Sequence, residues 1–213
     1  MMMKDIKALV PPNFGWLQMK LDPIVMKRIN KYIKDHKKIS HNHKLAGNIT
    51  KSNLLEDKDN WLWSNVLYPC VTEYTRHFGE RVINGVLTKD CRFVLNSLWV
   101  NFQKKYEFNP VHDHGGVFSF VIWIKIPFDY KKEKNLPFVK HSNSVKAADF
   151  EFLYNDILGR LTTFNYTLDK SKEGDMLFFP AVLKHQVYPF YTSDKERISV
   201  SGNISLNPED IIR

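Results

Sequence analysis

Three histidines in the second half of the chain have the spacing of ligands for one metal ion. His112 and His114 are separated by one residue, and His185 follows far downstream, after a short apolar segment. In an extended segment, residues i and i+2 project from the same side, so the first two imidazoles can converge on one ion. A third imidazole from a distant strand would complete a facial set and leave coordination positions open, which suits non-haem Fe(II).

The residue between the first two histidines leaves a second ligand set open. If the segment stays extended, the ligands are His112, His114 and His185. If the chain turns after His112, as the glycines at 115–116 would allow, Asp113 could replace His114 and give two histidines and one carboxylate. The period-2 geometry of a strand favours the three-histidine set.

An arginine downstream of the histidines could bind an anion. Arg197 lies on a predicted strand with apolar neighbours, which indicates that its side chain is buried. A buried guanidinium needs a specific partner, and its fork of donors matches a carboxylate. We therefore expect Arg197 to bind a carboxylate of a co-substrate.

The elements that must position these residues change in kind along the chain. Two amphipathic segments, 23–36 and 59–77, predict helices in the first part. From residue 90 onward, short apolar segments alternate with turns and predict strands at 92–102, 117–126, 161–168, 176–179, 186–191 and 197–206. This pattern predicts an antiparallel barrel or double-sheet sandwich. We expect one domain, with a helical layer over 1–89, a β core over 90–207, and a long loop or lid over 129–156.

Composition limits the classes of protein that the chain can belong to. Hydrophobic residues make up 43% of its 213 residues and charged residues 25%, which is usual for a folded soluble domain. The sequence shows no membrane span and no signal peptide, so we expect a cytoplasmic protein. Two cysteines exclude a disulfide scaffold and a thiolate metal site. The formal net charge of +8 favours anionic partners. Nucleic acid is compatible with this charge as a partner, but no sequence feature indicates it.

Two segments that carry these residues resemble a known family. NPVHDHGGVFSFVIWIKIP at 109–127 and GDMLFFPAVLKHQVYPFYTSDKERISVSGNISL at 174–206 are similar to the 2-oxoglutarate/Fe(II)-dependent dioxygenases. The similarity is greatest to prolyl-4-hydroxylase-like members encoded by marine T4-like phages, and LAGNI at 45–49 extends it into the helical part. The resemblance implies a double-stranded β-helix (jelly roll), and a phage origin would place the protein in the cytoplasm of the host.

The resemblance also implies an activity and roles for individual residues. The implied enzyme uses Fe(II) and 2-oxoglutarate to hydroxylate an unidentified substrate, a small molecule or a protein, and releases succinate and CO2. Arg197 would bind the distal carboxylate of 2-oxoglutarate, Ser199 would assist it, and Asn101 would line the same pocket. No catalytic residue is expected beyond the metal ligands.

One departure from the family pattern keeps other functions open. The family's acidic ligand stands two residues after the first histidine, where this chain has His114. A three-histidine dioxygenase of the cupin type, which needs no 2-oxo acid, is one alternative. A non-catalytic jelly-roll protein, binding or virion-associated, is another, because fold does not determine function. The order of the histidines and Arg197 along the chain favours the 2-oxoglutarate-dependent enzyme. The sequence does not indicate an oligomeric state.

Overall fold

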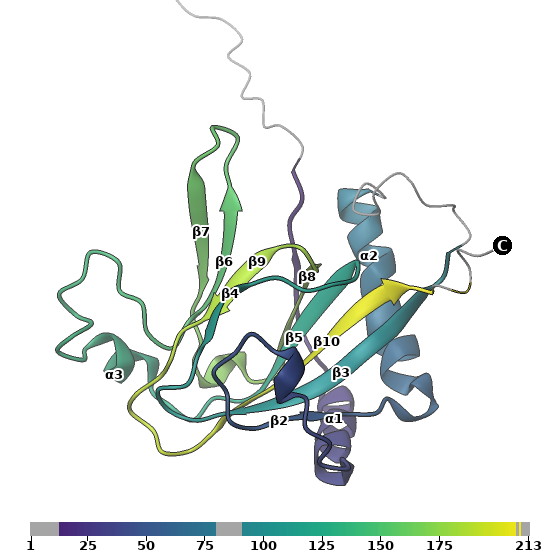
Figure 1. The fold of residues 1–213 in the computed structure, drawn as a ribbon, viewed down its shortest axis with the longest axis horizontal. Coiled ribbons are helices and arrows are strands. Elements are labelled where there is room, and N and C mark those ends of the chain that lie inside the picture. Colours follow the sequence, from purple (N-terminus) through teal and green to yellow (C-terminus); the bar gives the residue numbers. More distant parts are fainter. Residues whose placement is uncertain (1–12, 80–90, 208, 210–213) are drawn as a thin grey trace, which may run out of the picture.

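The computed structural model describes residues 13–79, 91–207 and 209, and its strands form two antiparallel sheets (Figure 1). The six-stranded sheet has the order β1 (Leu17–Lys20), β8 (Asp175–Pro180), β5 (Phe118–Lys125), β10 (Arg197–Leu206), β3 (Phe93–Gln103) and β2 (Ser52–Leu54). The four-stranded sheet has the order β4 (Asn109–His112), β9 (Lys184–Val187), β6 (Phe150–Asn155) and β7 (Leu161–Tyr166). The predicted antiparallel double-sheet architecture is confirmed.

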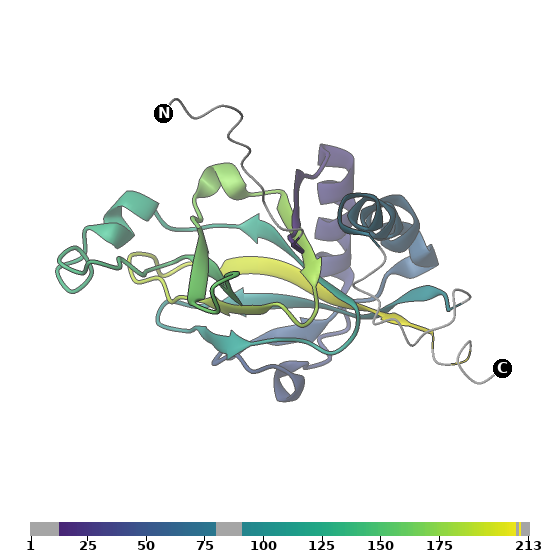
Figure 2. The same ribbon diagram turned by 90° about the horizontal axis from the view of Figure 1, so that it is seen from above.

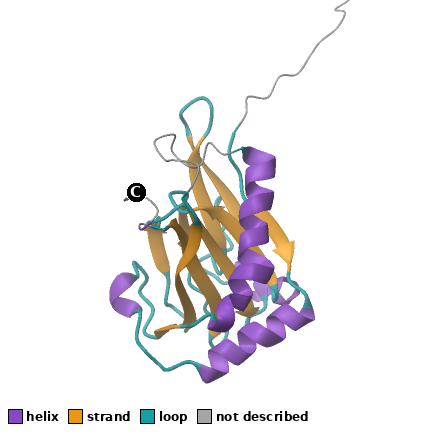
Figure 3. Cartoon of the chain, turned by 90° about the vertical axis from the view of Figure 1, so that its right-hand side faces the viewer, coloured by secondary structure: helices purple, strands orange, loops and turns teal. Residues whose placement is uncertain are grey.

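Two helices cover the outer face of the six-stranded sheet, as Figure 3 shows. Helix α1 spans Pro23–Asp35, with its proline in the first turn, where the missing N–H costs nothing. Helix α2 spans Tyr68–Phe78 and continues a π-helical stretch over Trp63–Leu67. The fully buried ring of Tyr74 packs against rings from β5 and β8, so the helical layer and the sheet share one core. The predicted N-terminal helical layer is confirmed.

A second apolar core fills part of the space between the two sheets. Trp123 of β5 stacks on Tyr166 of β7, with ring centroids 4.9 Å apart. Phe150 and Phe152 of β6 meet Phe179 of β8 in the same layer. Figure 2 shows the sheets from above. Because these rings hold the sheets together, the polar side chains between the sheets are confined to the remaining space.

The segment 129–156 corrects one sequence-based expectation. It is not a continuous loop, because it contains the short helix α3 (Tyr130–Lys134) and the strand β6 (Phe150–Asn155). The charged residues of this segment made a strand hard to predict from composition. Glu151 is buried within β6, where it accepts hydrogen bonds from Gln186 and Tyr188 and pairs with Lys146. A buried carboxylate with several partners can lie in a strand that composition alone marks as solvated.

Other boundaries differ from the sequence-based expectations in smaller ways. Strands β1 and β2 come from the part expected to be helical, and they form the two edges of the six-stranded sheet. Strand β9 begins at Lys184, two residues earlier than expected. The expected boundary at 89–90 lies outside the described residues. Single turns of 3₁₀ helix occur at Asn42–Lys44, Lys58–Asn60 and Lys170–Lys172. No helix within the described ranges has the length and apolarity needed to cross a bilayer.

Candidate metal centre and adjoining pocket

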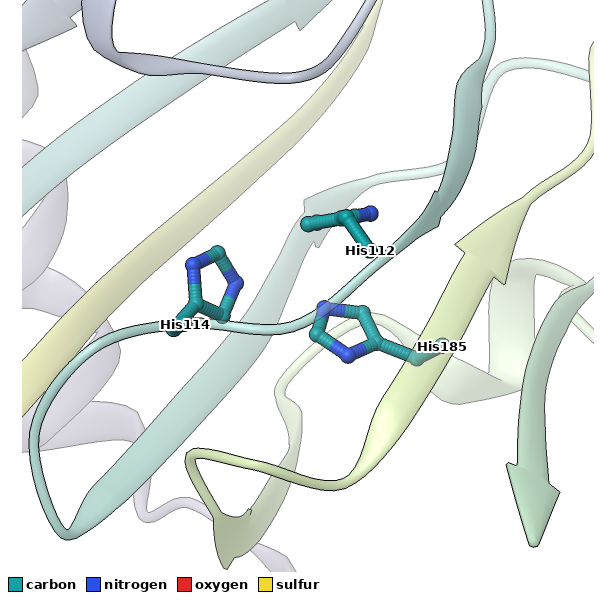
Figure 4. Close-up of side chains that lie close together, drawn as sticks. All are labelled: His112, His114 and His185. Atoms are coloured by element: carbon teal, nitrogen blue, oxygen red, sulfur yellow. The ribbon is translucent and has the colours of Figure 1, made fainter.

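Pairing between β4 and β9 brings the first and last of the three histidines together. His112 lies directly opposite His185 in this ladder, although the two residues are far apart in sequence. His114 follows β4, and its backbone N–H donates to the carbonyl of Ala181 at 2.9 Å. One ring nitrogen of each histidine lies within 4.8 Å of the others, as Figure 4 illustrates. The three imidazoles are therefore close enough to bind one ion.

Backbone carbonyls fix the orientation of two of the three rings. Nδ1 of His112 is 2.7 Å from the carbonyl oxygen of Pro110, and Nδ1 of His185 is 2.9 Å from that of Leu183. A carbonyl oxygen can only accept, so both Nδ1 atoms carry the proton. The Nε2 lone pairs are then free to bind a metal, with the carbonyl holding each ring in place.

Burial keeps all three imidazoles in the form that binds a metal. It lowers the pKa of His112, and it lowers that of His114 to about 4, with repulsion from His112 adding to the effect. The pKa of His185 falls well below its ordinary range for the same reasons. At neutral pH the cluster is therefore uncharged and can accept a divalent cation.

Asp113 lies outside this cluster. Its carboxylate accepts a hydrogen bond from Lys184 Nζ at 2.8 Å, and its side chain is 46% exposed. The ion pair with Lys184 lowers the pKa of this carboxyl. Of the two ligand sets that the sequence left open, the geometry of the described residues is that of the three-histidine set.

A small cavity adjoins the histidines and extends over the inner face of the six-stranded sheet. Its volume is about 40 Å³. Two cross-strand pairs between β3 and β10 line it, Trp99 with Ser201 and Asn101 with Ser199. Within the described part of the chain, Trp99 Nε1 and Asn101 Oδ1 are buried without a hydrogen-bond partner. Buried polar atoms are rarely left unpaired, so these atoms fit a site that receives a polar ligand.

Arg197 forms the next cross-strand pair on the same face, opposite Gln103. Its guanidinium is buried and donates to Gln103 Oε1, to the carbonyl of Ala148 at 2.9 Å and to that of Tyr188 at 3.1 Å. Burial lowers the pKa of Arg197 to about 9, which leaves it charged at neutral pH. It does not line the cavity itself, so a ligand would reach it only past Asn101 and Ser199.

Two parts of this site were not predicted from the sequence. Asn109 on β4 lines the cavity, and its Oδ1 is also buried without a partner among the described residues. The segment 45–47 closes the cavity beside it, so tightly that a Cβ on Gly47 would lie 1.9 Å from Asn109 Oδ1. Gly47 and Asn109 are far apart in sequence, so no local pattern predicts their contact. The resemblance of LAGNI at 45–49 to the family pointed to this segment but gave it no role.

The similarity to known proteins agrees with this geometry. The family described as "Putative 2OG-Fe(II) oxygenase" matches residues 97–203, which is half of the chain. The chain belongs to this family. The family uses Fe(II) and 2-oxoglutarate, so the expected enzyme class and cofactors are confirmed. A search among curated proteins gives no match.

Solved structures confirm the jelly-roll fold of this oxygenase. A Pseudomonas putida prolyl-4-hydroxylase has a TM-score of 0.51 and 11% identity, with 91% of this chain and 94% of that chain covered. An oxidoreductase of the 2OG-Fe(II) oxygenase family from Burkholderia pseudomallei has a TM-score of 0.50 and 13% identity, covering 90% and 84%. At such low identity, the likeness concerns the fold alone.

The residues present fit the two cofactors to different degrees. Three neutral imidazoles, two of them with Nε2 freed by a carbonyl contact at Nδ1, fit Fe(II). The polar groups around the cavity suit 2-oxoglutarate, because buried polar atoms without partners line it and the buried cation Arg197 lies beyond them. Its volume of about 40 Å³ is close to that of one water molecule, so a five-carbon diacid must displace a lining side chain.

The buried histidines should make the metal-free protein sensitive to acid. Histidines of the unfolded chain titrate near 6.5, whereas His114 in the folded chain titrates near 4. Below pH 6.5 the unfolded state therefore binds more protons, and the free energy of unfolding should fall as the pH drops from 6.5 toward 4. Urea denaturation of metal-free protein at pH 7 and pH 5 measures this, and His114→Gln should reduce the difference. Equal stability at both values would contradict the prediction.

Proposed function

We propose that the protein is an Fe(II)- and 2-oxoglutarate-dependent hydroxylase whose iron is held by His112, His114 and His185. The observation that carries this proposal is the convergence of three neutral imidazoles whose ring nitrogens lie within 4.8 Å of one another. Two of them have their Nε2 atoms freed by carbonyl contacts at Nδ1. Membership of the oxygenase family supports Fe(II) as the ion.

The inner face of the six-stranded sheet would hold the co-substrate. When bound, iron and 2-oxoglutarate together supply the oxidising chemistry that hydroxylates a substrate, with release of succinate and CO2. We propose that Arg197 binds the distal carboxylate, and that Ser199 and Asn101 contact the co-substrate between Arg197 and the histidines. The cross-strand order supports these roles, because the pair of Arg197 and Gln103 follows the pair of Ser199 and Asn101.

The substrate would approach from the side of His114. A groove of about 730 Å³ shares Leu45, Trp99 and His114 with the cavity, and it does not reach His112 or His185. Both acidic residues of the groove are already bonded: Asp113 to Lys184, and Asp57 to Tyr32 and two backbone N–H groups. A polar substrate, a small molecule or an exposed protein segment, would therefore meet neutral polar groups and Lys44 there. A phage origin and action in a host cytoplasm remain part of the proposal.

Turnover of the co-substrate tests the proposed function. Purified protein is incubated in air with Fe(II), ascorbate and 2-oxoglutarate, alone and with pools of small metabolites or peptides, and succinate is measured. The proposal expects succinate formation that requires Fe(II) and is lost in His185→Ala. Iron binding with oxygen consumption that needs no 2-oxo acid would instead support the cupin-type dioxygenase. Tight zinc binding without turnover would support a structural metal site.

A further inference from the structure

The buried guanidinium of Arg197 is held by a neutral side chain. Gln103 Oε1 accepts from Arg197 Nε at 3.1 Å and from Nη2 at 2.6 Å, a contact that uses two of the five guanidinium donors. A carboxylate in this place would form a closed ion pair with the guanidinium. An amide oxygen orients the fork without supplying a negative charge of its own.

The nearby carboxylates do not take over this role. Asp149 accepts from Lys134 and Asn165 through Oδ2, while its Oδ1 has no hydrogen-bond partner among the described residues. Glu133 accepts from the backbone N–H groups of Tyr191 and Thr192. Neither lies within ion-pair distance of Arg197, whose bonds in the described structure all go to neutral acceptors. Both carboxylates raise the pKa of Arg197 through space, but neither is bonded to it, so the guanidinium can still bind a carboxylate from a ligand directly.

The orientation of Gln103 is fixed from both ends of its amide. Its Nε2 donates to the carbonyl of Glu107, so its Oε1 must face the guanidinium. The rings of Phe128 and Phe190 lie 5.7 and 5.6 Å from the centre of the guanidinium. Arg197 is thereby held in one position before any ligand binds, which lowers the entropic cost of binding an anion.

We propose that Gln103 is a positioning residue that keeps Arg197 oriented and free of a directly bonded carboxylate, so that the pocket selects a 2-oxo acid with a distal carboxylate. The inference rests on the proposed function and extends it from the metal ligands to the selection of the co-substrate. It attributes the selectivity to the neutral amide of Gln103 as well as to the charge of Arg197.

A near-isosteric substitution that adds a charge and removes the N–H donor to Glu107 tests this inference without relying on turnover. Gln103→Glu keeps the shape of the side chain and places a carboxylate on Arg197. Anaerobic protein loaded with Fe(II) is titrated with 2-oxoglutarate and with 2-oxoglutaramate, whose distal group is a neutral amide, and the visible charge-transfer absorption is followed. We expect the Kd for 2-oxoglutarate to rise about 10- to 100-fold in Gln103→Glu, as for loss of a charged hydrogen bond, while the Kd for 2-oxoglutaramate changes little.

Three further measurements make the outcome decisive. Gln18→Glu, on the exposed edge strand β1, introduces the same charge far from the pocket and should leave both Kd values unchanged. Gln103→Met removes the acceptor without adding charge. It should weaken the binding of 2-oxoglutarate while the protein still prefers 2-oxoglutarate to 2-oxoglutaramate. The Kd for Fe(II) should be the same in all variants, which checks that each has folded.

Two results would overturn the inference. The first is a wild-type preference for 2-oxoglutarate that persists in Gln103→Glu. The second is an equal loss of preference in Gln103→Met, because that result would show a packing effect without a role for charge. Absence of any charge-transfer band in the wild-type protein would count against the proposed function instead, so the two failures are distinguishable.

Discussion

Replacement of His185 by alanine should remove Fe(II) binding. His185 is 4% exposed, one of its ring nitrogens lies within 4.8 Å of those of the other two imidazoles, and its Nδ1 is held by the carbonyl of Leu183. Loss of a partner behind a ligand costs about 10- to 100-fold in metal affinity, so loss of the ligand itself should cost at least about 100-fold. Anaerobic equilibrium dialysis with Fe(II) measures the change directly.

The neighbouring residues provide a matched comparison for this experiment. His114→Ala should also weaken Fe(II) binding severely, whereas Asp113→Ala should retain the wild-type affinity, because Asp113 pairs with Lys184 on the surface. Retained binding in His114→Ala together with lost binding in Asp113→Ala would contradict the three-histidine site. It would favour a chain that turns after His112 when iron binds.

Replacement of Arg197 by methionine should damage both co-substrate binding and stability. The substitution leaves two buried acceptors, Gln103 Oε1 and the carbonyl of Ala148, and the half-buried carbonyl of Tyr188 without their donors. Unpaired buried groups cost about 1–3 kcal/mol each, partly offset here because a buried charge is also removed. We expect a loss of about 3 kcal/mol in the free energy of unfolding, measured by urea denaturation of the metal-free protein.

The same variant should bind 2-oxoglutarate much more weakly while still binding Fe(II), because Arg197 does not contact the histidines. Arg197→Lys keeps the charge without the planar fork, so its stability and its affinity for 2-oxoglutarate should be intermediate. Wild-type affinity for 2-oxoglutarate in Arg197→Met would show that the distal carboxylate is bound elsewhere in the pocket.

Local sequence patterns predicted the elements that hold the site. The amphipathic segment at 23–36 predicted α1, and the apolar segment at 117–126 predicted β5. The i and i+2 relation of His112 and His114 was visible because it is local. His185 was predicted as the third ligand from its residue type and its place after a short apolar strand, and β4–β9 pairing brings it beside His112.

The remaining features depend on contacts that no local pattern contains. Glu151 is buried in a strand because Lys146, Gln186 and Tyr188 surround it, and those partners come from other segments. The contact of Gly47 with Asn109 likewise joins two distant segments. The bond from Arg197 to Gln103 depends on the register between β10 and β3, so the sequence pointed to the cation but not to the group that orients it.

The most direct test of the central claim is an anaerobic titration of wild-type protein with Fe(II) and then 2-oxoglutarate, followed by visible absorption. The account predicts a metal-to-ligand charge-transfer band that requires both additions, weakens in Arg197→Met and is absent in His185→Ala. Iron binding without this band would contradict binding of 2-oxoglutarate at a three-histidine iron. Failure to bind Fe(II) at all would contradict the metal site itself.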